Sequence, residues 1–489
     1  MVRGRTPVSL DLPMPAALAD GAAASKQDLA YGALRDAILT GVLAAGVRMP
    51  STRTLALRWQ LSRGTVETVY DRLCLEGYLA RRQGAGTFIA AAIPDAYLSI
   101  LTPRPRRSEE AGGSQPATIQ HGGSWVSIGR PFVARFPDPA LFSWHHWSRL
   151  MAKAASPSRT ALQGQSDPTG LPALRTQISD YLRKFRNIDC APDDILMTTG
   201  TRHALDLIGR CYLSAGDTVC IEDPCYPFAH QIFALTGASI AHVPVRADGM
   251  DTAALPADGD VRLVYVTPAH QSPLGIAMPV NRRLELLEWA MSHDAVIVED
   301  DYDSEFSYGG APLPALMSID QSGRTIYCGS FNKTLCPDMR IGFIVAKGQA
   351  RQKLARMWNL VGRSVSIAEQ ITLESYLRTG AFARHLRVAR HAYAQRRDRL
   401  LKILDERADG RFSVSGHEAG FHFVLWLKNG QSEADICEKA ANFGITLQPL
   451  SALCCHTQLP AAVIIGYTAL TPDQIEEAGR TLGGILAEG

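Results

Sequence analysis

The segment GSFNKTLCPDMRIG, residues 329–342, decides the fold of this chain. A β-rich run, Thr325–Gly329, leads into it and predicts a strand that ends at Ser330. Lys333 then presents an amine at the edge of a sheet, where a lysine can form an imine with an aldehyde. Ser330 and Arg340 flank this lysine and offer a hydroxyl and a guanidinium to a phosphate. The segment therefore predicts a site for a carbonyl compound, with groups beside it that suit a phosphate.

A second segment, EDDYDSEF at residues 299–306, follows another predicted strand, Ala295–Glu299. Asp300 and Tyr302 stand where that strand ends, and open α/β sheets bind ligands outside the carboxyl ends of their strands. A pyridinium nitrogen needs an anion beside it to stay protonated and to draw electrons from a Schiff base. Because of its position relative to Tyr302, Asp300 is a better candidate for that anion than Asp301.

Two further strand ends carry candidate ligands. Gly200 and Thr201 follow the predicted strand Ile195–Thr198 and begin a helix, whose free N–H groups and dipole suit a phosphate. Tyr226 comes just after the predicted strand Thr218–Glu222, where its ring could stack on a heteroaromatic cofactor. His270 lies in a loop beside a proline segment, and we expect it to be structural.

The chain of 489 residues is too long for one ordinary core. From Trp125 to the end, β-rich runs alternate with helical stretches, which predicts an α/β sheet covered by helices. The remaining predicted strands are Leu263–Val266 and Ile341–Val345. Residues 93–124 are rich in Pro, Gly, Ser and charge, so they predict a flexible linker between a domain at 26–92 and one at 125–489.

The segment before the linker is basic, with nine Lys or Arg against five acids between Lys26 and Ala92. It predicts a first helix, a short helix, a tight turn and a second helix capped by Ser62, in helix-turn-helix order. Val66, Val69, Tyr70 and Leu73 would face the core, so the opposite face would be free for DNA. The outward side chains of that helix are Arg63, Thr65, Thr68 and Arg72. Glycines at 84 and 86 predict a hairpin beside the helices, which is a wing.

The bulk composition excludes several classes of protein. The ten cysteines show no C-x-x-C spacing, so the sequence predicts neither a zinc site nor a disulfide framework, and we expect no metal. The N-terminus lacks a continuous apolar region of the kind that signal peptides have. No charge-free apolar run is long enough to span a bilayer. We therefore expect a soluble, cytoplasmic protein with no membrane partner.

The run from Tyr31 to Phe88 resembles the winged helix-turn-helix of the GntR superfamily of regulators. The matching elements are Gly46-x-x-Met49-Pro50-Ser51-x-Arg53, Leu61-Ser62-Arg63-x-Thr65-Val66 and Gly77-Tyr78-x5-Gly84-x-Gly86-Thr87. The resemblance implies contacts to double-stranded operator DNA from Arg53, Arg63, Thr65 and the wing at Gly86, and the outward Thr68 is a further candidate. The alternative is a three-helix unit that serves only as a structural or protein-binding cap.

The region from Trp125 to Gly489 resembles fold-type I, class I/II aminotransferases, and the whole chain resembles the MocR/GabR subfamily of GntR regulators. The resemblance implies an α/β fold with a mainly parallel sheet, a small C-terminal α+β subdomain, and pyridoxal 5′-phosphate (PLP) as cofactor. Lys333 would form the Schiff base, Asp300 would pair with the pyridine nitrogen, and Tyr302 and Gln271 would lie near the ring hydroxyl. Tyr226 would stack on the ring, and the phosphate would be held by Gly200, Thr201, Ser330 and Arg340.

The sequence departs from the aminotransferase pattern at the substrate end. Those enzymes carry a late arginine that grips the substrate carboxylate, but no arginine occurs between Arg411 and Arg480. Phe228 stands where the GABA-responsive branch of the family has another such arginine. A carboxylate would lose a charge-assisted contact, which disfavours GABA and ordinary α-amino acids as ligands. Gln165 and Asn332 are smaller departures that concern the affinity for PLP.

We therefore expect a ligand-responsive, homodimeric transcription factor whose large domain senses a small amine, an amino acid or PLP itself. A ligand must bind one arrangement of the dimer better than another to have any effect on DNA binding. We expect at most partial aminotransferase chemistry and name no catalytic residue. The first alternative is an active aminotransferase with a fused DNA-binding module, and the second is a large domain that is only a cofactor-free dimerisation scaffold.

Overall fold

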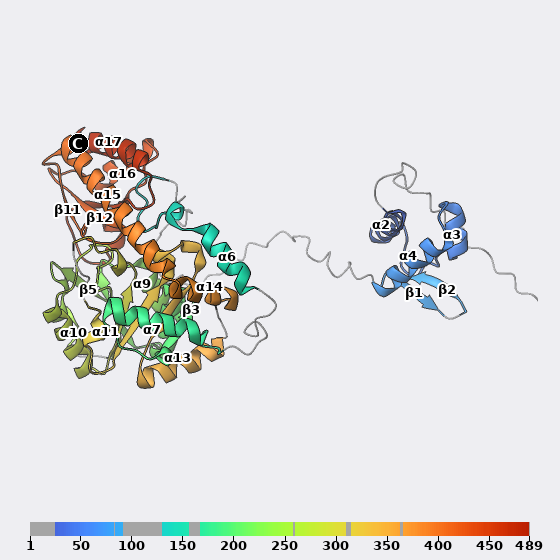
Figure 1. The fold of residues 1–489 in the computed structure, drawn as a ribbon, viewed down its shortest axis with the longest axis horizontal. Coiled ribbons are helices and arrows are strands. Elements are labelled where there is room, and N and C mark those ends of the chain that lie inside the picture. Colours follow the sequence, from blue (N-terminus) through green and yellow to red (C-terminus); the bar gives the residue numbers. More distant parts are fainter. Residues whose placement is uncertain are drawn as a thin grey trace, which may run out of the picture. The chain divides into compact units, whose positions relative to one another are not determined.

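The computed structural model of the chain describes residues 25–82, 84–90, 130–155, 167–257, 260–309, 314–361 and 365–488. The chain divides into two compact units, Met1–His121 and Gly122–Gly489, and we treat each by itself (Figure 1). The predicted linker at 93–124 and the departure at Gln165 lie outside the described residues.

Within its described residues, the smaller unit has three helices and a two-stranded hairpin. Its elements are α2 (Lys26–Leu39), α3 (Thr52–Arg58), α4 (Arg63–Leu75), β1 (Leu79–Arg82) and β2 (Gly86–Ile89). The side chain of Ser62 accepts a hydrogen bond from the backbone N–H of Thr65 and so caps α4, as the sequence predicts. The four predicted core residues of α4 are all buried. The strands pair antiparallel, with Leu79 opposite Ile89.

The larger unit is built on an eight-stranded sheet in the order β3-β10-β9-β8-β7-β4-β5-β6. Its strands are β3 (Ile195–Thr198), β4 (Thr218–Asp223), β5 (Ser239–Arg246), β6 (Gly249–Met250), β7 (Val261–Val266), β8 (Val296–Asp301), β9 (Thr325–Ser330) and β10 (Gly342–Val345). Neighbours from β9 to β5 pair in parallel, whereas β10 runs antiparallel to both of its neighbours. The predicted, mainly parallel α/β sheet is confirmed.

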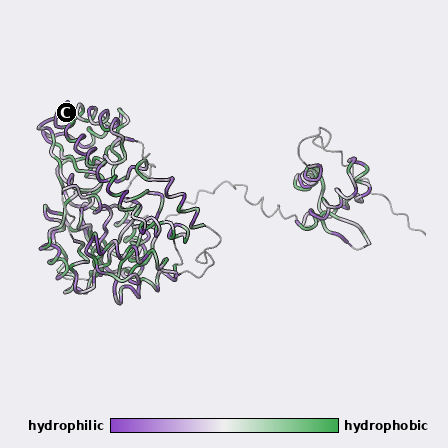
Figure 2. The backbone as a smooth tube through the Cα atoms, viewed as in Figure 1, coloured by the Kyte–Doolittle hydropathy of each residue, from purple (hydrophilic) through white to green (hydrophobic). Residues whose placement is uncertain are grey.

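Helices cover both faces of this sheet. The helices of this part of the larger unit are α6 (Trp144–Ala154), α7 (Pro172–Arg186), α8 (Thr201–Tyr212), α9 (Pro227–Ala234), α10 (Val280–Ser292), α11 (Leu316–Ile319), α12 (Phe331–Thr334), α13 (Gly348–Val361), α14 (Ile367–Arg378) and α15 (Ala381–Ala408). One apolar cluster joins α8, α9 and α13 to the sheet, and another joins α10 and α11 to it. Central strands therefore read as continuous apolar runs, because both of their faces are buried. The helices change between hydrophobic and hydrophilic along their length (Figure 2).

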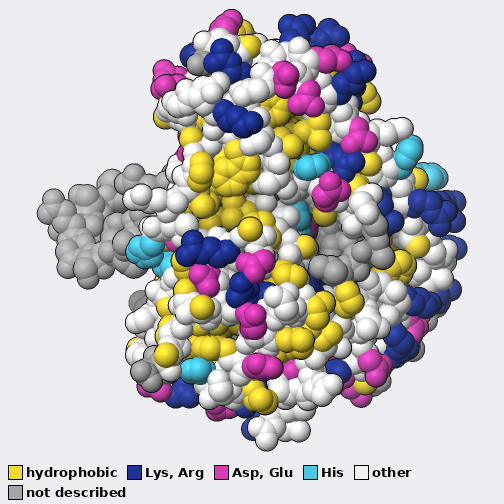
Figure 3. Space-filling model, turned by 90° about the vertical axis from the view of Figure 1, so that its left-hand side faces the viewer, with side chains coloured by type: hydrophobic (Ala, Val, Ile, Leu, Met, Phe, Trp, Pro, Cys, Tyr) yellow, Lys and Arg dark blue, Asp and Glu magenta, His cyan; other side chains and the backbone are white. Residues whose placement is uncertain are grey.

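A small C-terminal α+β subdomain follows. Its four-stranded antiparallel sheet has the order β11-β12-β14-β13. Its elements are β11 (Phe412–Ser415), β12 (His422–Leu427), α16 (Glu433–Asn442), β13 (Gln448–Pro449), β14 (Ala462–Gly466) and α17 (Pro472–Glu488). Short 3-10 turns in the larger unit are η2 (Pro139–Leu141), η4 (Pro192–Asp194), η5 (Thr252–Ala254), η6 (Ser304–Phe306), η7 (Pro337–Met339) and η8 (Ser451–Leu453). In Figure 3, hydrophobic side chains gather between this subdomain, at the top, and the sheet layers below.

None of the helices in the described ranges is long and apolar enough to pass through a membrane.

Candidate functional site

The predicted ligands meet at one edge of the central sheet because of its topology. β8 and β9 are parallel neighbours, with Asp300 opposite Cys328 and Asp301 opposite Gly329. β10 begins at this edge, with Gly342 opposite both Ser330 and Thr198. The carboxyl ends of β3, β8 and β9 therefore lie together, and the residues that follow them share one site.

Lys333 lies in the single turn of α12, directly after β9. Its amine donates a hydrogen bond to the backbone carbonyl of Arg135 at 2.5 Å and lies 5.4 Å from the ring centre of Phe136. Burial lowers the pKa of this lysine to about 8, and the nearby cation of Arg135 adds to the shift. An amine with such a pKa is partly neutral near pH 7, which is the form that reacts with carbonyl groups.

The two adjacent carboxylates have different surroundings. Asp301 forms a buried ion pair with Arg186 at 2.7 Å and also accepts hydrogen bonds from Tyr327 and Ser304. Asp300 accepts one hydrogen bond, from Tyr265 at 2.8 Å, and its Oδ1 is buried without a partner in the described part of the chain. Burial raises the pKa of Asp300 to about 7. Of the two, only Asp300 keeps an oxygen for a ligand.

Tyr302 is joined to a buried pair that the sequence did not assign to the site. His270 Nδ1 lies 2.9 Å from the carboxylate of Asp303 and 3.3 Å from the hydroxyl of Tyr302. Burial opposes protonation of His270, but the carboxylate of Asp303 outweighs it and raises the pKa of this histidine. The pair orients the phenol of Tyr302 towards the site, which agrees with the structural role that we expected for His270.

Tyr226 stands at the start of α9, as the residue before Pro227. Its hydroxyl accepts a hydrogen bond from Nε of Arg202 at 3.3 Å, and its ring centre lies 5.4 Å from that of Phe228. The guanidinium of Arg202 also lies over the ring of Phe228, 3.4 Å from its centre. Phe228, which stands where the GABA-responsive branch of the family has an arginine, thus has the guanidinium of Arg202 from α8 against its ring.

The predicted phosphate cradle is closely packed. Gly200 has a φ of 106°, and a Cβ there would lie 2.6 Å from Nδ2 of Asn332. A Cβ on Gly342 would lie 2.8 Å from the Cα of Gly200, so both glycines are required for these segments to meet. Ser330 Oγ accepts a hydrogen bond from the N–H of Asn332 and caps α12, while Arg340 is exposed. Asn332, one of the predicted departures, thus joins the two halves of the cradle.

Gln271 does not face a ligand as predicted. Its Nε2 donates to the carbonyls of Pro224 and Ser272 at 2.8 and 3.0 Å, and its Oε1 accepts from the N–H of Leu274. The side chain is buried and its hydrogen-bonding groups are used within the loops themselves. Gln271 therefore holds the loops that follow β4 and β7, and we no longer propose it as a cofactor ligand.

Arg135 belongs to the site, although the sequence analysis did not single it out. Its Nη2 donates to Oε1 of Gln448 at 2.6 Å, and its Nη1 is buried with no partner among the residues described. Its charge acts on the phenols of Tyr302 and Tyr226. The backbone of Arg135 is unusual as well: its φ is 71°, a left-handed conformation that is uncommon for residues other than glycine.

These surroundings fit PLP. The unpartnered Oδ1 of Asp300 is a buried acceptor that a protonated pyridine nitrogen would satisfy, and Lys333 supplies an amine of lowered pKa. Gly200 and Gly342 pack closely against Asn332 and against each other, which brings the end of β3 next to α12 and Lys333.

The candidate DNA interface lies on the smaller unit. Arg53, Arg63 and Thr68 are exposed, and no ion pair holds either arginine within the described ranges. Thr65 shares a hydrogen bond with Ser62 at the start of α4, so it also serves the helix cap. Gly86 has a φ of 109°, and a Cβ there would lie 3.1 Å from the guanidinium of Arg48. Arg48, which was not predicted, therefore packs against the wing.

Arg72, which the sequence analysis placed among the outward side chains, has a structural role. It pairs with Asp28 at 3.2 Å and Glu76 at 3.1 Å, and it lies 3.8 Å from the ring centre of Tyr31. These contacts tie α4 to α2, so this side chain is engaged within the unit.

Comparison with known proteins supports both units. The description "Bacterial regulatory proteins, gntR family" matches residues 26–89, and "Aminotransferase class I and II" matches residues 145–482. The "probable rhizopine catabolism regulatory protein MocR" of Rhizobium meliloti is 34% identical over 462 residues, which cover 92% of each chain. The chain is a MocR-type member of the GntR family. The MocR-type chain thus joins a GntR DNA-binding domain to an aminotransferase-like domain of the PLP-dependent fold.

Two other relatives illustrate the two sides of this family. The "HTH-type pyridoxine biosynthesis transcriptional regulator PdxR" of Corynebacterium glutamicum is 31% identical to the MocR-type chain and covers 93% of it and 93% of its own length. Among solved structures, the kynurenine aminotransferase of Pyrococcus horikoshii aligns with a TM-score of 0.67 and 27% identity, over 74% of this chain and 92% of the enzyme. The full-length relatives named here are regulators, whereas the enzyme matches the larger unit alone.

Proposed function

We propose that this MocR-type chain is a PLP-dependent transcriptional regulator whose larger domain senses a small amine, an amino acid or PLP itself. The observation that carries the proposal is that Lys333 and Asp300 lie at the same edge of the sheet. The first has an amine of lowered pKa, and the second has a buried oxygen without a partner among described residues. A cofactor-free scaffold would gain nothing from these two groups, and an unsatisfied buried acceptor such as that of Asp300 costs about 1–3 kcal/mol.

Each remaining residue has a role in this proposal. Tyr302 would hydrogen-bond the ring hydroxyl, oriented by His270. Tyr226 would stack on the ring, and Gly200, Thr201, Ser330 and Arg340 would hold the phosphate. When bound, PLP supplies a carbonyl group that captures amines and a ring that withdraws electrons.

The DNA-binding part of the proposal rests on the GntR domain, which we place at residues 26–92. Arg53, Arg63, Thr65, Thr68 and the wing at Gly86 would contact operator DNA, with 93–124 as the linker and 125–489 as the sensing and dimerisation domain. A homodimer in the cytoplasm would address two half-sites. An effector would act by binding one arrangement of this dimer more tightly than another.

The test begins with full-length protein mixed with PLP. The absorption spectrum is recorded before and after borohydride, and the reduced adduct is located by mass mapping. We expect a visible band and an adduct on Lys333, and Lys333→Ala should retain its fold by circular dichroism but form no adduct. An adduct on another residue, or no band at all, would overturn the cofactor assignment and leave the GntR domain standing.

A working aminotransferase is the second candidate. The lowered pKa of Lys333 and the unpaired Nη1 of Arg135 favour it, because both suit an enzyme that binds amino acids. Steady turnover of an amino donor and a keto acid would establish it. A single half-reaction without turnover would support the regulator.

A further inference from the structure

Arg135 brings its guanidinium next to a segment of the C-terminal subdomain that lacks the arginine expected in an aminotransferase. The late segment at residues 463–468, in which an aminotransferase arginine is expected, contains none. Within that segment, Ile464 of β14 pairs in register with Gln448 of β13. Arg135 donates from Nη2 to the side chain of this same Gln448 at 2.6 Å. The guanidinium therefore lies beside β14, although it comes from a segment more than three hundred residues earlier in the chain.

The guanidinium is also set up to receive an anion. No aspartate or glutamate of the described residues pairs with Arg135, and its Nη1 is buried without a partner. The backbone carbonyl of Arg135 accepts the hydrogen bond from the amine of Lys333. Arg135 therefore contacts this amine through its backbone and presents its guanidinium from its side chain. The phenols of Tyr302 and Tyr226 and the imidazole of His422 also lie near its charge. A ligand joined to the site through its amino group would thus have its acid group within the reach of Arg135.

We propose that Arg135 binds the acid group of the effector, and that the effector is an amine carrying a carboxylate or a sulfonate. This inference rests on the proposed function. It reverses the expectation from sequence that acidic ligands lose their partner, because a fork of guanidinium donors matches the oxygens of either group.

The experiment compares amines with and without an acid group on PLP-loaded full-length protein. Glycine is paired with methylamine, and β-alanine and taurine are each paired with ethylamine, with the visible absorption change as the binding signal. We expect the acidic member of at least one pair to bind the wild type more tightly. Arg135→Gln should weaken that ligand about 10- to 150-fold and leave its amine partner within about threefold.

Two further variants keep the result interpretable. Arg135→Lys keeps the charge without the fork and should restore part of the preference, while Arg262→Gln, at an exposed ion pair far from these contacts, should change nothing. A wild type with no preference for acids, or a preference that survives in Arg135→Gln, overturns the inference. If Arg135→Gln loses PLP itself, the arginine serves the cofactor and the inference also fails. Failure of the wild type to hold PLP would instead refute the proposed function.

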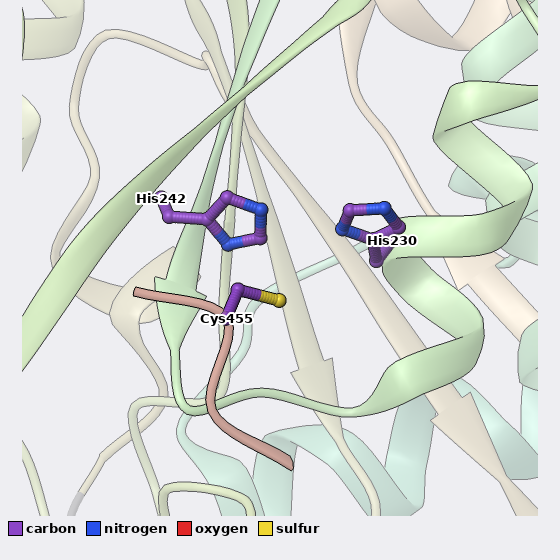
Figure 4. A group of neighbouring side chains, drawn as sticks. All are labelled: His230, His242 and Cys455. Carbon is purple, nitrogen blue, oxygen red and sulfur yellow. The ribbon is translucent and has the colours of Figure 1, made fainter. Parts of the chain in front are cut away.

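A separate observation concerns a cluster outside this pocket. His230 of α9, His242 of β5 and Cys455, just after η8, direct their side chains towards one another, and their nitrogen and sulfur atoms lie within 4.8 Å of one another (Figure 4). The Nδ1 atoms of both histidines are buried without partners among the described residues. The carboxylate of Asp223 accepts the N–H groups of Cys455, His456 and Thr457, each at 2.8 Å, and fixes the loop.

We infer that His230, His242 and Cys455 bind a divalent transition-metal cation such as Zn²⁺, for which imidazole and thiolate are the usual ligands. His456 is a neighbour of this cluster, with its ring centre 4.9 Å from that of His242. The spacing of the cysteines did not indicate this site, since only one of its three ligands is a cysteine.

The test is a zinc titration of the full-length protein against a chromophoric chelator. We expect one equivalent of Zn²⁺ to bind, and Cys455→Ser and His242→Ala each to weaken it at least tenfold. Cys437→Ser, at a partly buried cysteine in α16, is the matched control and should have no effect. Binding of less than one equivalent, or equal affinity in all variants, would refute the site.

Discussion

The hydroxyl of Tyr265 donates a hydrogen bond to Oδ2 of Asp300 at 2.8 Å, and Oδ1 of the same carboxylate has no partner among the described residues. Tyr265 lies on β7 and Asp300 on the neighbouring β8, so two strands of the sheet fix the direction of this carboxylate. A carboxylate held in this way presents one oxygen to a ligand at the sheet edge without a loss of side-chain entropy on binding.

Asp300→Asn should weaken the retention of PLP about 10- to 150-fold, because a hydrogen bond between charged groups contributes about 1.5–3 kcal/mol. Tyr265→Phe, which removes only the orienting bond, should cost about fivefold. Equilibrium dialysis of the cofactor measures both. Equal retention by Asp300→Asn and the wild type would mean that the pyridine nitrogen is not held here.

Asp301→Ala should instead reduce the stability of the fold. It leaves Arg186 as a buried charge without its 2.7 Å partner, which costs about 3–5 kcal/mol. Urea denaturation of the cofactor-free protein is the measurement. A loss below about 1 kcal/mol would show that the ion pair is not the support that its burial indicates.

Capture of PLP by Lys333 should depend on pH with a midpoint near 8. The neutral amine reacts, and its pKa is lowered from the ordinary value of 10.5 to about 8. The neutral fraction is then about a tenth at pH 7 and about a half at pH 8. Stopped-flow absorbance should therefore show a rate that rises about fivefold between these two values and levels off above pH 9. A tenfold rise for each unit up to pH 10 would indicate an unperturbed lysine.

Arg63→Ala should weaken binding to DNA, whereas Arg72→Ala should destabilise the smaller unit. Arg63 is exposed and unpaired among described residues, but Arg72 ties α4 to α2 through Asp28 and Tyr31. Fluorescence anisotropy with a mixed-sequence duplex at several salt concentrations is the measurement. We expect the Arg63 variant to lower the salt slope by about 1 without a change in thermal stability. An unchanged slope would remove Arg63 from the interface.

The sequence predicted the parts of the fold that depend on local patterns. The central strands were predictable because both faces of the sheet are covered. Ile297 of β8 is buried on one face and Ile326 of β9 on the other, so both kinds of position are apolar and the strands become continuous apolar runs. The helix cap at Ser62 and the positions of the candidate ligands at the ends of β8 and β9 were also predictable, because each follows from a local sequence rule.

The sequence could not predict contacts that arise only from tertiary structure. Arg135 precedes Lys333 by 198 residues, and nothing near it in the sequence shows that the two meet. Gln271 lies in the expected loop, but its direction depends on the carbonyl of Pro224, which reaches it from another strand end. Arg72 has the spacing of an outward residue, yet Asp28 and Tyr31 on another helix engage it.

The backbone of Arg135 sets stability against recognition. An L-residue with a φ of 71° carries strain of about 1–2 kcal/mol that glycine would not have, and the buried Nη1 adds to the cost. A glycine at this position would relieve the backbone strain, but it would lose the guanidinium and its hydrogen bond to Gln448. The strained backbone is therefore the cost of placing a guanidinium at this point of the site.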